Sequence, residues 1–273
     1  MAKDFAAAFR IKPGSAVSLA KRDPGDTAAC GVSDKKTGRE RTEKDAAVID
    51  ALQDRLYAEG KRSVLVVLQG TDTAGKDGTI RAVFNATGPL GVTVTPFRRP
   101  SEEELAHDFL WRAHIAAPRR GCIGIFNRSH YEDVLIGRVR KLAPADAIER
   151  RYEQINAFEQ LLSENGTTVL KFMLHISSKE QAERLRERLA ERKSQWKFNP
   201  GDLEDRKLWN RYQQAYEIML QRCSTAHAPW HVIPSDHKWV RNAAIARIVR
   251  LKLEEMNPQY PRPPWNPKSF VIR

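Results

Sequence analysis

The eight residues GTDTAGKD, at positions 70–77, decide the fold that we expect for this chain. They match the GxxxxGK pattern of a phosphate-binding loop. The run SVLVVLQ (63–69) before them is apolar and rich in β-branched residues, as in a buried strand, and the residues from Lys76 through Val83 suit a helix. A strand, a glycine-rich loop and a helix in this order aim backbone N–H groups at an anion. The stretch therefore predicts a site that binds phosphate.

Two acidic residues are unusual in such a loop. The residue after the lysine is commonly Ser or Thr, whose hydroxyl binds Mg²⁺, but here it is Asp77. Asp72 lies inside the loop, where its charge would repel phosphate unless a cation neutralised it. We expect Asp72 to bind a divalent cation together with phosphate oxygens, because Mg²⁺ favours one or two carboxylates plus phosphate. The alternative for either residue is to cap the following helix, and we assign capping or a supporting role to Asp77.

The size and composition of the chain suit one α/β domain, because 41% of its 273 residues are hydrophobic. No apolar run approaches the ~18 residues of a membrane span, and the N-terminus lacks the apolar stretch of a signal peptide. Cys30, Cys122 and Cys223 lie far apart without a CxxC pair, which disfavours a disulfide framework or a zinc site. We therefore expect a cytoplasmic protein with no membrane partner.

The net charge of +12 predicts a polyanionic partner, because a positive excess concentrates polyanions near the surface and speeds their capture. Nucleic acid is the usual partner of such a chain. The sequence nevertheless has no helix-turn-helix signature, zinc-finger spacing or RNP-type aromatic motif. We therefore expect no specific nucleic acid, since another polyanion would account for the charge equally well.

Strands and helices alternate along the chain, which predicts a parallel sheet with helices on both faces. Beyond the first strand and the loop helix, we expect strands at 91–95, 121–126, 167–175 and 231–234, and helices at 101–112, 144–164 and 239–256. The capping box Ser101–Glu104 opens the first of these helices. We predict a single domain over 1–273, with an irregular arm at 1–43 and a proline-rich tail at 257–273.

A second group of polar residues, NRSHYED (127–133), follows the third predicted strand. Ligands of open α/β sheets bind at the carboxyl ends of the strands, so we expect this group to face the phosphate loop. Asn127 stands where a Walker B aspartate is usual, and Glu132 could restore the missing carboxylate. Arg128 is placed to clamp a phosphoryl group during transfer. The structural alternatives are a surface ion pair for Arg128 and a Ser129–Glu132 capping box that only starts a helix.

Several motifs, taken in order, resemble those of the polyphosphate kinase 2 family: GTDTAGKDGTI (70–80), HDFLWR (107–112), FNRSHYEDVL (126–135), WKFNPGDLEDRKLW (196–209) and APWHVIPSDHKW (228–239). Matching segments run from Arg10 to Trp239 and cover most of the chain. The form with Asn127 and Glu132 resembles the subgroup that phosphorylates both nucleoside mono- and diphosphates. Other members carry Asp at the position of Asn127.

The resemblance implies a P-loop kinase core similar to thymidylate kinase, with a helical lid over 179–222. It implies an enzyme that transfers phosphoryl groups reversibly from inorganic polyphosphate to nucleoside mono- and diphosphates such as AMP and ADP. Mg²⁺ is the implied cofactor, with Mn²⁺ as the alternative ion, and a homo-oligomer is the implied assembly.

The resemblance also assigns site residues. Asp72 is similar to the metal-binding acid of the Walker A loop and Lys76 to its phosphate-binding lysine, while Asn127, Arg128 and Glu132 occupy the Walker B region; we expect these five to be catalytic. Nucleotide or phosphate binding is expected from Gly70, Thr71, Thr73, Ala74, Gly75, Asp77, Gly78, Arg112 and Arg188. A basic groove for polyphosphate is expected from Arg81, Arg98 and Arg99.

The lid segment contains an arginine stripe on one helix face, at Arg184, Arg188 and Arg192, four residues apart. For each arginine, the alternative to substrate contact is a solvated, ion-paired face. We interpret Trp196 and Trp209 as core or hinge anchors rather than as platforms on which a base stacks.

Two other functions remain open on the sequence alone. An ATP-dependent nucleoside monophosphate kinase on the same core needs no polyphosphate, and it leaves the charge of +12 unexplained. A non-enzymatic module that binds polyanions or nucleic acid needs no catalytic residues, and the presence of Asp72, Lys76 and Arg128 together argues against it. Turnover with polyphosphate would establish the first function, and turnover with ATP and a nucleoside monophosphate would separate the other two.

Overall fold

The structure, a computed structural model, describes residues 5–266 and 269–270. At its centre is a five-stranded sheet in the order β2-β3-β1-β4-β5, in which every neighbouring pair is parallel. The strands are β1 (Ser63–Gln69), β2 (Val92–Pro96), β3 (Ile123–Asn127), β4 (Thr167–His175) and β5 (Trp230–Pro234). The parallel sheet expected from the sequence is confirmed, and all of its predicted strands are present.

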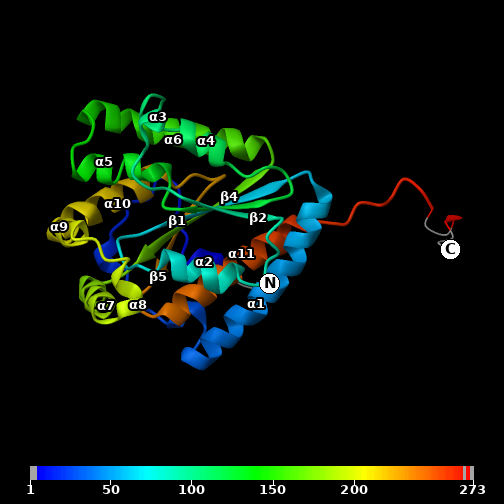
Figure 1. The fold of residues 1–273 in the computed structure, drawn as a ribbon, viewed down its shortest axis with the longest axis horizontal. Helices are drawn as coiled ribbons and strands as arrows, with labels where there is room; N and C mark the ends of the chain where they lie inside the picture. The colour runs from blue at the N-terminus through cyan, green and yellow to red at the C-terminus, as the bar shows by residue number, and fades with distance from the viewer. Residues whose placement is uncertain (1–4, 267–268, 271–273) are drawn as a thin grey trace.

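Helices cover both faces of the sheet (Figure 1). One face carries α1 (Lys35–Glu59), α2 (Lys76–Phe84) and α11 (Lys238–Met256), and the other carries α6 (Ala145–Glu164) and α10 (Trp209–Cys223). Side chains alternate along a strand, so β1 sends Val64 and Val66 into one hydrophobic core and Leu65 and Val67 into the other. Every β1 residue is buried, as suits a central parallel strand.

The long helix α1 overturns the expectation of an irregular arm as far as residue 43. The arm ends at Asp34, whose carboxylate accepts hydrogen bonds from the backbone N–H groups of Lys36 and Thr37. The Thr37 hydroxyl in turn accepts from the Asp34 N–H, which completes a capping box. This reciprocal cap satisfies N–H groups that have no partner within the helix, and it starts α1 at Lys35.

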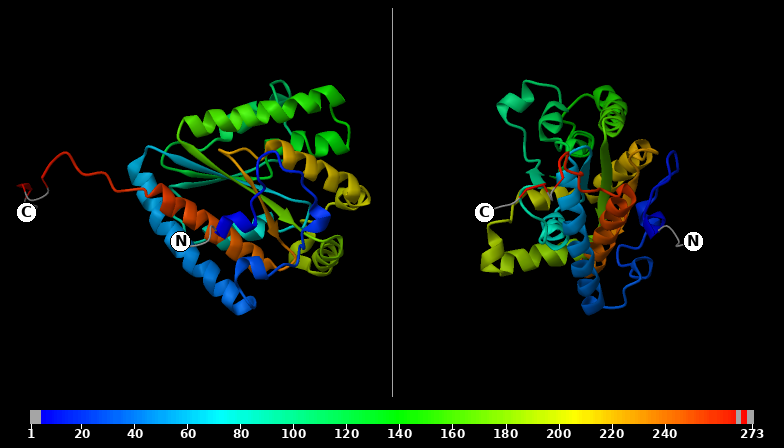
Figure 2. Two further views of the ribbon diagram at one scale, coloured as in Figure 1. Left: turned by 180° about the vertical axis from the view of Figure 1, so that it is seen from behind. Right: turned by 90° about the vertical axis from the view of Figure 1, so that its right-hand side faces the viewer.

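The rest of the N-terminal arm lies along the outer edge of β5 (Figure 2). It contains the short 3₁₀ helices η1 (Phe5–Ala8), η2 (Leu19–Lys21) and η3 (Ala28–Cys30). The Ile11 N–H donates to the Trp230 carbonyl at 2.8 Å, and the Val232 N–H donates to the Phe9 carbonyl at 2.9 Å. The arm therefore pairs with backbone groups that an edge strand would otherwise leave open.

The helix predicted over 101–112 is wrong in its extent. The Ser101–Glu104 capping box forms as expected, but it opens only α3 (Glu102–Leu105). The Asp108 carboxylate then accepts from the Leu110 N–H at 2.9 Å, a local turn that interrupts the helix before α4 (Trp111–Ala116). The predicted helix at 144–164 is confirmed as α6, and it is preceded by the single turn α5 (Ile136–Val139).

The segment predicted as a lid is helical and divides into two parts. The first part holds α7 (Ser178–Ala190), α8 (Arg192–Gln195) and α9 (Gly201–Lys207), at the carboxyl end of the sheet (Figure 1). The second part is α10, whose Tyr216 and Met219 are buried in the core beside α6. The second part therefore belongs to the body of the domain, and a lid role stays a prediction for the first part.

The C-terminal tail has no helix or strand over 257–266 and leads away from the body (Figure 2); part of the predicted tail, 267–268 and 271–273, lies outside the described residues. Cys30, Cys122 and Cys223 are buried free thiols. Within residues 5–266 and 269–270, no helix is both long and apolar enough to cross a membrane.

Candidate active site

The phosphate loop leaves β1 at Gly70 and enters α2 at Lys76. At two positions in it, steric crowding requires glycine. Gly70 has φ 155°, and a Cβ there would lie 2.9 Å from the Leu174 carbonyl oxygen. Gly75 has φ 106°, and a Cβ there would lie 1.9 Å from Nη1 of Arg241. A side chain at either position would therefore displace the loop or the groups packed behind it.

Lys76 is buried beneath the loop that it is expected to serve. Its ammonium donates to the Gly70 carbonyl at 2.7 Å and to the Thr71 carbonyl at 3.2 Å. Burial lowers the pKa of Lys76 to about 8; the nearby Arg128 charge adds to the shift, and the Asp72 charge opposes it. The Lys76 ammonium thus ties the start of the loop to the start of α2, and Lys76 also lines the adjacent cavity.

Arg128 joins the loop to the end of β3. Its backbone has φ 60°, unusual for a non-glycine residue, and its N–H donates to the Leu68 carbonyl at 3.0 Å. Its Nη2 lies 2.5 Å from Oδ1 of Asp72, and its Nη1 lies 3.2 Å from Oε2 of Glu132. The Glu132 charge first, and the Asp72 charge after it, raise the pKa of Arg128 despite burial. The group at 127–133 therefore faces the phosphate loop, as predicted from the sequence.

Asp77 and Asn127 meet on the other side of the loop. Asn127 Nδ2 donates to Asp77 Oδ1 at 2.8 Å, and Lys197 Nζ lies 3.4 Å from Asp77 Oδ2. Although burial raises the pKa of Asp77, the Asn127 hydrogen bond and the Lys197 charge bring it below its ordinary value. Asp77 does not cap α2, because Gly75 holds that position and no side chain caps it. The supporting role is the alternative that the contacts favour.

The Ser129–Glu132 capping box forms only in part. The Ser129 hydroxyl accepts from the Tyr131 N–H at 3.1 Å and so caps the 3₁₀ helix η4 (His130–Asp133). The Glu132 carboxylate does not reach back to the Ser129 N–H; it faces Arg128 instead. Glu132 therefore does not act as a helix-capping residue, which was its structural alternative.

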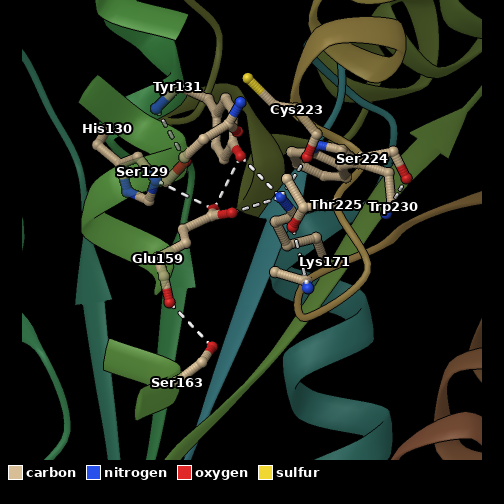
Figure 3. A network of polar contacts seen from close by, with 12 residues as sticks. Ser129, His130, Tyr131, Glu159, Ser163, Lys171, Cys223, Ser224, Thr225 and Trp230 are labelled. Atoms are coloured by element: carbon tan, nitrogen blue, oxygen red, sulfur yellow. Dashed lines mark hydrogen bonds and ion pairs between the residues drawn. The ribbon is translucent and has the colours of Figure 1, made fainter. Parts of the chain in front are cut away.

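A buried polar network holds η4 from below (Figure 3). Lys171 on β4 and Glu159 on α6 form an ion pair with an N–O distance of 2.5 Å and no solvent exposure. Tyr131 donates to Glu159 at 2.8 Å and accepts from Lys171 at 2.8 Å, while Lys171 also donates to the Cys223 carbonyl at 2.6 Å. The turn that carries Arg128 and Glu132 is thereby tied to α6, β4 and α10.

A cavity of about 740 Å³ opens beside the loop, between the sheet edge, α7, α8 and the start of α11. It is lined by most of the predicted residues: Asp72, Thr73, Gly75, Lys76, Asp77, Gly78, Arg98, Asn127, Arg128 and Arg188. A second cavity, of about 30 Å³, shares Asp72 and Arg128 with it and is lined by the predicted Gly70, Thr71 and Glu132. The sequence-predicted site is therefore largely one place in the fold.

Four predicted residues lie outside both cavities within the described part of the chain. Ala74 is buried in the core beneath the loop. Arg112 donates to the Arg98 carbonyl at 2.9 Å and lies 3.6 Å from Asp133, so it supports a cavity residue and does not line the cavity itself. Arg81 and Arg99 are exposed away from the cavity. Of the three arginines predicted to bind polyphosphate, only Arg98 lines the cavity, and the binding role of all three stays a prediction.

Sequence reasoning missed several residues of the cavity wall, among them Arg184, Trp196, Lys197, Lys238 and Arg241. The four-residue period identified the arginine stripe but not which face is buried. Arg184 is 6% exposed and donates to backbone carbonyls of the loop, so its solvated-face alternative is wrong. Trp196 is 78% exposed, so it is not a core anchor, and its hinge alternative stays a prediction; Trp209 packs against the core.

The site fits a divalent cation only in company with phosphate. Among the residues that the structure describes, no three His, Cys, Asp or Glu side chains gather closely enough to hold a metal ion. Asp72 borders the cavity, and Arg128 engages only its Oδ1. One carboxylate completed by phosphate oxygens is the donor set that Mg²⁺ uses in phosphoryl-transfer sites, and Mn²⁺ accepts the same oxygens.

Comparisons with known proteins point the same way. Residues 32–261 match the family described as Polyphosphate kinase 2 (PPK2). The AMP/ADP-polyphosphate phosphotransferase of Meiothermus ruber is 47% identical over 268 residues, which are 97% of this chain and 98% of that protein. The ADP-polyphosphate phosphotransferase of Rhodopseudomonas palustris is 40% identical over 222 residues, 77% of each chain. The crystal structure of polyphosphate kinase 2 from Arthrobacter aurescens TC1 has a TM-score of 0.93 and 40% identity, covering 98% of this chain and 95% of that one.

Proposed function

This chain belongs to the polyphosphate kinase 2 family, and from that membership we propose that it transfers phosphoryl groups reversibly from inorganic polyphosphate to AMP and ADP, forming ADP and ATP. The likeness to a solved member also confirms the P-loop kinase fold. The observation that carries the proposal is the basic cavity, in which the phosphate loop, Lys76 and the Asp72–Arg128 pair meet beside further cationic side chains.

The transfer needs alignment and charge balance more than proton chemistry. A phosphate oxygen of the acceptor nucleotide attacks the terminal phosphorus of the polymer, and the bond from that phosphorus to the bridging oxygen breaks. The bridging oxygen leaves with the shortened polymer. The acceptor oxygen is already ionised near neutral pH, since the second pKa of a phosphate ester is about 6. The reaction therefore needs no general base.

The chain's own residues divide the work. The loop N–H groups and Lys76 hold the phosphates in line. The Arg128 guanidinium contacts Asp72 and Glu132 in this structure. During transfer it stabilises the negative charge that develops on the phosphoryl group. Asn127 holds Asp77 in place beside Lys197. Arg188 reaches the same cavity from α7. Its Nη1 lies 3.4 Å from Oδ2 of Asp202 at the start of α9.

A divalent metal belongs to this chemistry, and we assign Mg²⁺ to Asp72. The ion, held by Asp72, would neutralise charge on the phosphate oxygens and so lower the repulsion between donor and acceptor. No other residue is assigned as a ligand: both carboxylate oxygens of Asp77 have partners in Asn127 and Lys197, and Glu132 pairs with Arg128.

Acceptance of both AMP and ADP is the finer part of the proposal. It rests on the Asn127–Glu132 form of the second motif and on the relative from Meiothermus ruber, which is named for both acceptors. The relative from Rhodopseudomonas palustris is named for ADP alone.

The test is ATP and ADP formation from long-chain polyphosphate and Mg²⁺, with AMP and ADP offered separately. We expect ADP to give ATP, and AMP to give ADP followed by ATP. Product from ADP alone would restrict the acceptors to diphosphates. If neither acceptor reacts with polyphosphate, while ATP phosphorylates a nucleoside monophosphate, the protein is a conventional kinase. Binding of polyphosphate without any turnover would identify a polyanion-binding module.

A further inference from the structure

Arg241, in the first turn of α11, is a buried cation without an acidic partner. Its side chain reaches the cavity wall, yet the residue is only 2% exposed. Among residues 5–266 and 269–270, it takes part in no ion pair with an Asp or Glu. A charge in such a position is costly, and buried charges are normally paired. The missing partner therefore needs an explanation.

The hydrogen bonds of Arg241 leave part of its guanidinium unused. A guanidinium carries five N–H groups. Nη1 donates to the Ala74 carbonyl at 2.9 Å, while Nε and Nη2 donate to Asn242 Oδ1 at 3.1 and 2.9 Å. The second N–H of each terminal nitrogen has no acceptor within the described residues. Arg241 thus keeps a pair of donors beside the cavity.

The position of these donors is set by two glycines at the N-terminal end of α2. A Cβ on Gly75 would lie 1.9 Å from Nη1, and one on Gly78 would lie 3.4 Å from Nη2. The guanidinium therefore packs closely against the first turn of the helix that follows the phosphate loop. Lys238, one turn earlier on the same helix, also lines the cavity and extends the cationic surface.

The neighbouring Arg184 shows the contrast. Its Nε donates to Glu180 at 2.8 Å, and its terminal nitrogens donate to four backbone carbonyls, those of Thr73, Ala74, Ser235 and Asp236. Every N–H of Arg184 is engaged, so its role is to strap the loop to the body. Ala74 accepts from both arginines, and it keeps one donor if Arg241 is removed.

We propose that Arg241 binds a phosphate unit of inorganic polyphosphate, beside the unit held by the loop and Lys76, and that the polymer supplies the missing counter-charge. This assignment rests on the proposed function and adds a subsite on the α11 side of the loop. Burial and the Arg184 charge lower the pKa of Arg241 to about 9, consistent with a cation that the protein alone leaves poorly compensated.

If Arg241 binds polyphosphate, removing its charge should weaken polyphosphate binding without lowering the stability of the free protein. Arg241→Met keeps much of the side-chain volume and removes the buried charge. We expect the free variant to melt no lower than the wild type, and long-chain polyphosphate or inorganic triphosphate to raise its Tm much less. The Kd for triphosphate should rise roughly ten- to hundredfold, the usual value of charge-assisted hydrogen bonds. The Kd for ADP should change less than about threefold on the same scale.

The experiment compares the wild type, Arg241→Met, Arg241→Lys and the control Arg184→Met by thermal unfolding and by calorimetric titration with triphosphate, long-chain polyphosphate and ADP. Arg241→Lys should recover part of the polyphosphate affinity. Arg184→Met should lower the Tm of the free protein, because it removes the donor to the carbonyls of Thr73, Ser235 and Asp236.

Several outcomes would overturn the assignment. A free-state Tm that falls in Arg241→Met as it does in Arg184→Met, with polyphosphate affinity unchanged, would make Arg241 a structural strap. A loss of ADP affinity in place of polyphosphate affinity would move the subsite to the nucleotide. If the wild type itself binds no polyphosphate, the proposed function fails as well, which separates that failure from a wrong assignment of Arg241 alone.

Discussion

At the scale of single residues, Arg128 and Lys76 both contact groups of the protein that substrate or metal could replace. Arg128 holds both Asp72 and Glu132, and Lys76 holds loop carbonyls. Each of these contacts can be exchanged for a phosphate oxygen or a metal ion without leaving a buried charge alone. The left-handed backbone at Arg128 belongs to this arrangement, because it turns the chain at the end of β3 towards the loop.

Asp72→Asn tests the metal assignment. The amide keeps the shape of the side chain and can still accept from Arg128, but it is a poor ligand for Mg²⁺. We expect turnover to fall by at least about a thousandfold, the scale of losing a principal electrostatic contribution. The circular dichroism and Tm should stay near wild type. Asp146→Asn, on an exposed pair with Arg150, is the matched control and should remain active. An active Asp72→Asn enzyme would refute the assignment.

The pKa of Lys76 predicts a pH dependence of phosphate binding. In the free protein the amine is protonated below about pH 8 and loses its proton as the pH rises through that value. Affinity for triphosphate should therefore be highest below that pH and decline above it. Calorimetric titrations from pH 6.5 to 9.5 would measure the decline. Lys76→Met should bind weakly at every pH and lack the step; the same step in this variant would assign it to another group.

At the scale of secondary-structure elements, sequence patterns predicted the sheet and the loop well. β1 is a continuous apolar run from Val64 to Leu68, and β4 is apolar from Val169 to Leu174 except for Lys171; both were located correctly. Asp72, Lys76 and Arg128 could be placed together because the carboxyl ends of neighbouring parallel strands share one edge of the sheet. Leu68 on β1 is indeed in register with Asn127 on β3.

Other elements were missed for physical reasons. The helix α1 is rich in charged residues, and its apolar side, with Ile49, Leu52 and Leu56, is narrow. The Asp34–Thr37 capping box was the signal that could have located its start. The sequence indicated neither Arg241 nor the burial of Arg184, because both donate to backbone carbonyls, which no sequence pattern displays.

The buried ion pair between Lys171 on β4 and Glu159 on α6 predicts how substitutions change the free energy of unfolding. Lys171→Met would leave the buried Glu159 carboxylate without its cation, at a cost of about 3–5 kcal/mol in the free energy of unfolding. The double change Lys171→Met/Glu159→Gln should recover most of that loss, because it removes both charges. Denaturant unfolding would measure both. Arg150→Met, which breaks an exposed pair on the same helix, should change stability by less than about 1 kcal/mol. Equal effects of Lys171→Met and Arg150→Met would show that the buried pair carries no special weight.

At the scale of the whole molecule, the charge of +12 should make capture of the polymer depend on salt. Binding of a polyanion releases condensed counterions, so the affinity for long-chain polyphosphate should fall roughly tenfold or more between ~50 and ~200 mM salt. ADP, with fewer charges, should lose affinity less steeply. Fluorescence titrations at several salt concentrations would compare the two slopes. Parallel slopes would show that the excess charge does not serve the polymer.

The central position of β1 has a consequence for how the protein opens. Its backbone amides are hydrogen-bonded on both sides, to β3 and β4, and buried in both cores. Such amides exchange with deuterium only when most of the domain unfolds, whereas short peripheral helices such as α8 and α9 open alone at small cost. We therefore expect the wall at the phosphate loop to belong to the slowest-exchanging part of the molecule, whereas the facing wall includes Ser194 of the short helix α8. We therefore expect α8, rather than the phosphate loop, to move when the polymer enters or leaves.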